Sequence, residues 1–79
     1  MEIKVLGTGC ANCKTLEKGV LIAVEELKIE AKVEKIEDIV KIMGYGIMKT
    51  PGLVINGKVV LSGRVPSVSE LKEIITKHQ

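Results

Sequence analysis

Two short aliphatic runs, Leu53–Ile55 and Lys58–Leu61, are separated by the dipeptide Asn56-Gly57. Asn and Gly tolerate the positive φ angles that a type I′ turn requires, and this turn joins antiparallel strands. The pattern therefore predicts a β-hairpin late in the chain, and any sheet that the chain forms must contain this antiparallel pair.

The first half of the chain changes from a strand pattern to a helix pattern. Glu2–Leu6 is a short aliphatic run that ends at Gly7-Thr8-Gly9, which indicates a strand followed by a tight loop. From Ala11 onward, apolar residues recur at three- and four-residue intervals and predict the longest helix. Gly19 lies inside this helix, and we expect it to mark close packing against a strand or another helix. The apolar stripe consists of Leu16, Val20, Ala23, Val24 and Leu27.

The second half repeats the alternation with shorter elements. Ala31–Ile36 alternates apolar and charged residues and predicts a strand whose buried face the pattern leaves open. Helical spacing then returns, and Gly44 is placed to end that helix. Ser67 and Glu70 form a capping box that predicts a last helix. The short helix carries Ile36, Ile39, Val40 and Met43 at helical spacing, and the last helix carries Leu71, Ile74 and Ile75, with Lys77 and His78 near its end.

The predicted order of elements is β-α-β-α-β-β-α, an α/β fold. Its simplest arrangement is a four-stranded mixed sheet with helices on both faces. Because 79 residues can build one hydrophobic core, residues 1–79 are expected to form a single domain. The core must be aliphatic, since the chain has one Tyr and no Phe or Trp.

Charge and hydropathy exclude several classes of function. Twelve basic and ten acidic residues are interspersed and give a net charge of +2, which is not the profile of a nucleic-acid-binding protein. The longest purely apolar run is Val20–Val24, far shorter than the ~20 residues of a membrane-spanning helix. We expect no signal peptide, no membrane association and a cytoplasmic protein.

The segment Cys10-Ala11-Asn12-Cys13 is the principal chemical motif. Two cysteines this close cannot connect distant parts of a fold, so their purpose should be chemical. At a helix N-terminus, amide N–H groups favour a thiolate and would lower the pKa of Cys10 from the free-thiol value of ~8.5. We therefore predict that Cys10 is a nucleophile and that Cys13, one turn further, resolves the mixed disulfide. The alternative is two inert, buried cysteines.

Pro51 is the second element of the candidate site. It follows Thr50 and directly precedes the first strand of the predicted hairpin. An X-Pro bond costs only ~0.5 to 1 kcal/mol in the cis form, so this bond is a candidate cis peptide. The alternative is a trans proline that starts an edge strand.

Taken together, Gly-Thr-Gly-Cys-Ala-Asn-Cys after a strand and Thr-Pro-Gly-Leu-Val-Ile-Asn-Gly before a last helix resemble the thioredoxin superfamily. The closest resemblance is to its minimal thioredoxin/glutaredoxin-like members, the redox-active disulfide proteins. The resemblance covers the whole chain. It implies a cis peptide at Pro51 and a backbone at Thr50 that hydrogen-bonds the substrate chain, so both are substrate-site residues. We expect protein disulfides rather than glutathione as substrates, because the Thr-Val-Pro and downstream acidic motifs typical of glutaredoxins are replaced here by Lys49-Thr50-Pro51 and Ser62-Gly63-Arg64. We also expect a thioredoxin-reductase-type electron donor, a monomer, and neither a cofactor nor a metal.

The sequence also departs from the family. Ala11-Asn12 replaces the Gly-Pro that is usual between the cysteines of thioredoxins, which leaves the redox potential open. Lys4 stands six positions before Cys10, where many thioredoxins have a buried Asp. We hypothesise that Lys4 biases the thiols electrostatically; the alternative is a lysine whose stem packs while its ammonium reaches water.

Three further residues receive smaller roles. Gly63 follows the hairpin, where related folds have a glycine beside the site, although a glycine after a strand is usually only a turn residue. Tyr45 is expected to pack rather than to take part in catalysis. His78 is expected to be solvated.

Two other functions stay open on the sequence alone. Small metal carriers also place Cys-x-x-Cys after a first strand, but their order is β-α-β-β-α-β, and two thiolates are half of a four-ligand site. The third possibility is an interaction domain that keeps the fold without redox chemistry.

Overall fold

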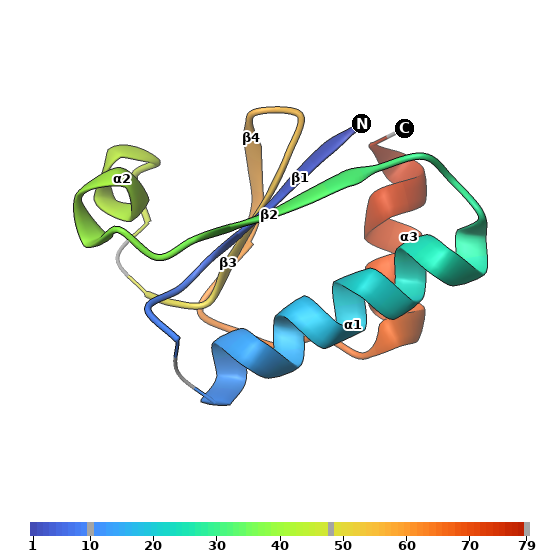
Figure 1. Cartoon of the computed structure of the whole chain (residues 1–79), viewed down its shortest axis with the longest axis horizontal. Coiled ribbons are helices and arrows are strands. Elements are labelled where there is room, and N and C mark those ends of the chain that lie inside the picture. Colours follow the sequence, from blue (N-terminus) through green and yellow to red (C-terminus); the bar gives the residue numbers. More distant parts are fainter. Residues whose placement is uncertain (10, 48, 79) are drawn as a thin grey trace.

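The computed structural model describes residues 1–9, 11–47 and 49–78. Its elements follow the predicted order β-α-β-α-β-β-α, and the α/β fold class is confirmed (Figure 1). The strands are β1 (Glu2–Leu6), β2 (Lys32–Ile36), β3 (Gly52–Ile55) and β4 (Lys58–Ser62), and the helices are α1 (Ala11–Leu27), α2 (Ile39–Gly44) and α3 (Val68–Lys77).

The four strands form one mixed sheet in the order β2-β1-β3-β4. Strands β1 and β2 are parallel, with Leu6 opposite Ile36, because α1 returns the chain to the start of the sheet. Strand β3 is antiparallel to both β1 and β4. The two central strands are therefore β1 and β3, and every residue of β3 is buried.

Helices cover both faces of the sheet, as predicted (Figure 1). Alternation along β1 divides its side chains between the two faces. Ile3 and Val5 pack with α1 and α3, whereas Leu6 packs on the other face with Ile42 of α2. The larger cluster is entirely aliphatic, and its fully buried members include Leu16, Val20, Leu53, Ile55, Leu71 and Ile75.

Gly19 lies where α1 packs against Leu71 of α3. A Cβ built on Gly19 would lie 2.9 Å from Leu71 Cδ1. The prediction that this glycine allows close packing against another helix is confirmed.

Helix α2 exposes most of the apolar residues that its helical spacing groups together. Ile39, Val40 and Met43 are 52%, 73% and 66% exposed, while Ile42 is buried against the sheet. Ile36, which shares their helical spacing, belongs to β2. The spacing therefore marks the helix but no core face. The N-cap of this six-residue helix is Asp38, whose Oδ1 accepts from the Val40 amide at 2.9 Å.

The predicted hairpin is confirmed. Asn56 and Gly57 have φ angles of 51° and 82° and connect β3 to β4. The pairing shifts between Leu53 and Val54, which produces a bulge in β4. Asn56 also connects the turn to β1 through two hydrogen bonds. Its side-chain Oδ1 accepts from the backbone amide of Glu2 at 2.9 Å, and its backbone amide donates to the Glu2 carbonyl at 2.7 Å.

The last helix begins at Ser67 as predicted, but the side-chain contacts at its two ends differ from those expected. Ser67 Oγ accepts from the Glu70 amide at 3.2 Å, whereas the Glu70 carboxylate pairs with Arg64 instead of completing a capping box. His78 is not simply solvated: it is half-buried, with Nδ1 2.9 Å from the Ile74 carbonyl oxygen. Its carbonyl accepts from Asn56 Nδ2 at 3.5 Å, so packing of α3 against the hairpin turn overturns that expectation.

None of the described helices is long and apolar enough to cross a membrane.

Candidate active site

Cys13 lies in the first turn of α1 and is 2% exposed. Cys10, predicted as the nucleophile, lies outside the described residues. The Cys13 side chain packs against Gly7, the residue that follows β1. A Cβ built on Gly7 would lie 2.8 Å from Cys13 Cβ and would overlap Cys13 Sγ. The lack of a side chain at Gly7 therefore makes the space that the sulfur occupies.

Pro51 lies at the same end of the sheet. The Thr50–Pro51 peptide bond is cis, as predicted, and Pro51 is fully buried. Leu6 of β1 pairs with Gly52 of β3. Gly7 directly follows Leu6 in the chain, and Pro51 directly precedes Gly52. This register brings the loop before α1 and the loop before β3 together (Figure 1).

Gly63 adjoins the Pro51 loop from β4. Its amide donates to the Pro51 carbonyl at 2.8 Å, and its φ of 75° is one that a glycine adopts without strain. A Cβ on Gly63 would lie 3.0 Å from Lys49 Cβ. Gly63 is thus both a turn residue and a direct neighbour of the predicted site.

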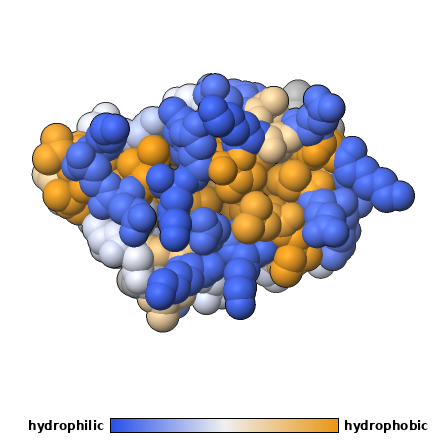
Figure 2. Space-filling model, in the orientation of Figure 1, coloured by the Kyte–Doolittle hydropathy of each residue, from blue (hydrophilic) through white to orange (hydrophobic). Residues whose placement is uncertain are grey.

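Thr50 borders an open apolar groove between α2 and the Pro51 loop. The groove has a volume of about 310 Å³. Its rim continues onto the exposed apolar residues of α2, which form the apolar patch at the left of Figure 2. The groove is lined by Ile39, Ile42, Met43, Gly46, Ile47 and Thr50.

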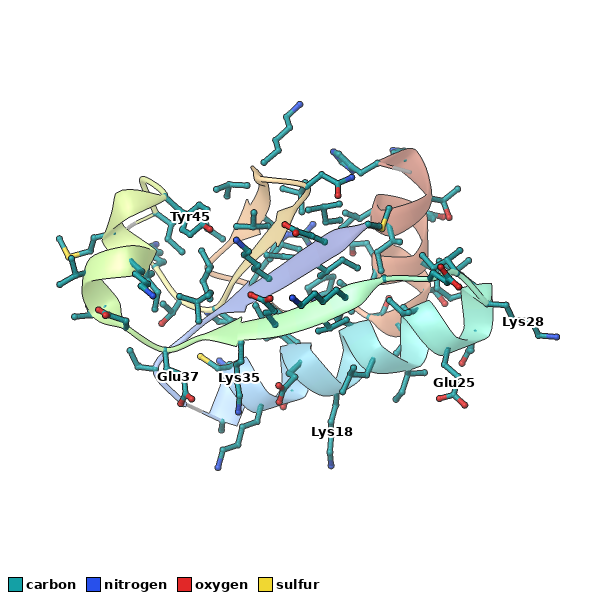
Figure 3. The ribbon with its side chains drawn as sticks, turned by 45° about the horizontal axis from the view of Figure 1, so that its top comes forward. Lys18, Glu25, Lys28, Lys35, Glu37 and Tyr45 are labelled. Carbon is teal, nitrogen blue, oxygen red and sulfur yellow. The ribbon has the colours of Figure 1, made fainter. Side chains whose placement is uncertain are left out.

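Lys4 points toward α2, on the sheet face opposite to α1. Its Nζ donates to the Tyr45 hydroxyl at 3.3 Å, and this hydrogen bond raises the pKa of Lys4. Tyr45 is half-buried and packs against the smaller apolar cluster, which includes Leu6 and Ile42 (Figure 3). This position agrees with a packing role. The structure places Lys4 in the middle of β1, on the other face of the sheet from the helix of Cys13.

Sequence reasoning missed Glu37. This residue follows β2, and a Cβ built on Gly9 would lie 3.5 Å from Glu37 Oε2 (Figure 3). A signal for it existed: β1 and β2 are parallel neighbours, so the residues after Leu6 and Ile36 emerge at the same edge of the sheet. Glu37 therefore places a carboxylate beside the loop that leads to Cys10.

Comparison with known proteins identifies the family. A family model described as a thioredoxin domain matches residues 1–76. The chain belongs to the thioredoxin domain family. The resemblance inferred from the cysteine motif and the Thr-Pro-Gly segment is therefore confirmed.

Two relatives span almost the same length as this thioredoxin-family chain. A protein named thioredoxin from Methanothermobacter thermautotrophicus is 45% identical over 76 residues, which cover 96% of this chain and 99% of the relative. A protein named thioredoxin from Methanocaldococcus jannaschii is 39% identical over 71 residues, which cover 90% of this chain and 81% of the relative.

The metal-carrier alternative is not supported. The family match assigns the chain to thioredoxins, and the observed order ends in hairpin and helix. It differs from the β-α-β-β-α-β order of the small metal carriers.

Proposed function

We propose that this thioredoxin-family chain is a thiol-disulfide oxidoreductase that reduces protein disulfides through Cys10 and Cys13. The observation that carries the proposal is the position of Cys13, packed against Gly7 in the first turn of α1, at the end of the sheet where the cis Thr50–Pro51 bond precedes β3. The family match and the two relatives named thioredoxin support the same activity.

The reaction is a two-step thiol-disulfide exchange. The Cys10 thiolate attacks one sulfur of the substrate disulfide, forms a mixed disulfide and releases the other substrate sulfur as a thiolate. The Cys13 thiolate then attacks the Cys10 sulfur and releases the second substrate thiolate. Two electrons pass from the dithiol to the substrate, the substrate thiolates take up two protons, and a Cys10–Cys13 disulfide remains.

The burial of Cys13 suits the resolving role. At 2% exposure it is shielded from a substrate in solution. A resolving cysteine needs no such access, because its target is the sulfur of the neighbouring Cys10 once that sulfur carries the substrate. We assign the first attack to Cys10 because it precedes α1, whose N-terminal amides favour a thiolate.

Thr50 and Pro51 are the proposed substrate-binding residues. Thr50 borders the apolar groove, so a substrate chain held by the Thr50 backbone could place an apolar side chain between α2 and the Pro51 loop. Lys4 is the proposed electrostatic modulator of the thiols.

The cellular setting is part of the proposal. We expect residues 1–79 to act as a single domain and a monomer in the cytoplasm, cycling between dithiol and disulfide. A thioredoxin-reductase-type donor would return electrons to the Cys10–Cys13 disulfide. The chain would then carry electrons from this donor to protein disulfides without a further cofactor.

An insulin-reduction assay tests the activity. Wild-type protein with dithiothreitol should accelerate insulin precipitation above the rate with dithiothreitol alone, and Cys10→Ser should abolish that acceleration. Cys13→Ser is the matched control, because it keeps the nucleophile and should accumulate a mixed disulfide visible by mass spectrometry. A wild-type rate equal to the dithiothreitol background, or full activity of Cys10→Ser, would refute the proposal. A redox-silent interaction domain would give the first of these results.

A further inference from the structure

Glu37 places a negative charge between two parts of the proposed site. On one side, its Oε2 would lie 3.5 Å from a Cβ on Gly9, in the loop before Cys10. On the other side, Ile39 is two residues away and lines the apolar groove with Thr50. Glu37 therefore lies beside the loop that leads to Cys10 and two residues before Ile39 of the groove.

The Glu37 carboxylate is available to a substrate. The residue is exposed, and within the described ranges it forms no ion pair. The nearby Lys35, by contrast, is already matched, since its Nζ lies 3.7 Å from Glu17 Oε1. Figure 3 places Glu37 at the end of β2, beside the start of α1.

Lys49 lies on the opposite side of the sheet from Glu37. The Lys49 stem packs against Gly63, next to β4, whereas Glu37 follows β2 at the other side of the sheet. Lys49 and Glu37 therefore flank the proposed site from opposite sides of the sheet.

We propose that Glu37 is a specificity-determining residue that selects substrate polypeptides carrying a Lys or Arg close to the disulfide, together with an apolar residue for the groove. This inference rests on the proposed function and assigns its substrate class. An exposed charge pair contributes little in water, so the preference for a basic over an acidic substrate should be about two- to fivefold in kcat/KM. Salt should reduce it.

Three disulfide-linked peptides test the inference. They share one sequence with an apolar residue beside the cysteine and differ at a single neighbouring position, which is Lys, Gln or Glu. The measured quantity is the ratio of kcat/KM for the Lys peptide to that for the Glu peptide, at low salt and at about 0.5 M NaCl. The ratio cancels any effect of a substitution on the reactivity of the thiols themselves.

The expected ratios follow from the charge at residue 37. Wild type should prefer the Lys peptide, Glu37→Gln should lose most of this preference, and Glu37→Lys should reverse it. Glu30→Lys is the matched control with the same change of charge. Glu30 is exposed and lies near Met1 and the Asn56 turn, at the opposite end of the sheet, so this variant should keep the wild-type ratio.

Each other result has a definite meaning. Three results would overturn the inference: a wild-type ratio near one, a preference for the Glu peptide, or a Glu37→Lys ratio equal to that of wild type. Each leaves the proposed function intact, provided that the Gln peptide is reduced. If no peptide is reduced above the dithiol background, the proposed function itself fails, and the inference with it.

Discussion

The Cys13 sulfur lies where a side chain on Gly7 would be, so the two residues are in close contact. Gly7 is buried, and its amide donates to the Ile36 carbonyl at 2.9 Å, so the loop before α1 is attached to β2 as well as to β1. The position of the proposed resolving cysteine therefore depends on a backbone that can neither move away easily nor accept a Cβ.

Gly7→Ala should impair both stability and activity. The added methyl group must displace the Cys13 side chain or the loop, and overpacking of this kind costs about 1–3 kcal/mol of unfolding free energy. Because displacement of Cys13 weakens its attack on the mixed disulfide, we expect insulin reduction to slow by roughly tenfold, equivalent to about 1.4 kcal/mol. Urea unfolding and the insulin assay measure the two effects.

Gly19→Ala is the control for a methyl group that overpacks away from the site. Its Cβ would press on Leu71 between α1 and α3. This variant should keep wild-type activity per folded molecule. Equal activity in Gly7→Ala and Gly19→Ala would mean that the contact between Gly7 and Cys13 has no role in the reaction.

Lys4→Met should raise the pKa of the Cys10 thiol. The substitution removes a cation that would favour the thiolate, while the methionine keeps much of the packing of the lysine stem. Tyr45→Phe is the matched variant, because it removes the hydrogen bond to Lys4 Nζ and leaves the cation in place. The pKa is measured from the pH dependence of iodoacetamide alkylation. An unchanged titration in Lys4→Met would exclude electrostatic tuning by this residue.

Met43→Gln should weaken the binding of apolar substrates. Met43 lines the groove beside Thr50, and replacing its apolar end with an amide removes favourable burial worth about one methylene group, or ~0.8 kcal/mol. We expect the KM for a disulfide peptide with a neighbouring Leu to rise about fourfold. Val40→Gln changes a similarly exposed residue of α2 that does not line the groove, and its KM should equal that of wild type. Parallel increases in both variants would contradict a specific role of the groove.

Arg64→Ala should destabilise the protein at neutral pH but not in acid. The Arg64 guanidinium hydrogen-bonds Glu70 and lowers the pKa of that carboxyl below its usual 4.5. A carboxyl whose folded pKa is lowered stabilises the fold above its unfolded pKa, and this stabilisation is lost as the pH falls through the folded value. The urea midpoints of wild type and Arg64→Ala should therefore differ at pH 7 and converge at about pH 3. A gap of equal size at both pH values would assign the effect to packing instead.

Glu70→Gln provides the reciprocal control. It removes the titrating group and retains a hydrogen-bonding side chain, so its difference from wild type should also vanish in acid. Because Gly63, the neighbour of Arg64, donates to the Pro51 carbonyl, loss of the ion pair should also loosen this side of the proposed site. Amide hydrogen exchange at Gly63 would report that loosening.

Elements governed by local chemistry were predictable. The Asn56-Gly57 turn is fixed by two residues that adopt positive φ, and the α1 stripe by spacing within one helix. The cis bond at Pro51 was inferred from family resemblance and is confirmed. The turn and the stripe depend on residues close together in the chain, whereas the cis bond was indicated by the family.

Features that depend on distant segments were missed or misread. Helix α2 exposes Val40 and Met43 because its link to β2 and its contact with the sheet fix its rotation. His78 was expected in solvent, but packing of α3 against the hairpin turn brings it to Asn56.

The sequence by itself determined the order of elements, the hairpin turn, the cysteine motif and the family, since each is encoded by neighbouring residues and their spacing. Tertiary structure alone decided that Gly7 makes room for Cys13, that the Pro51 loop adjoins it, and that Glu37 faces the loop before Cys10. The physical reason is that these contacts arise from strand register: the pairing of Leu6 with both Ile36 and Gly52 brings three separate loops to one edge of the sheet.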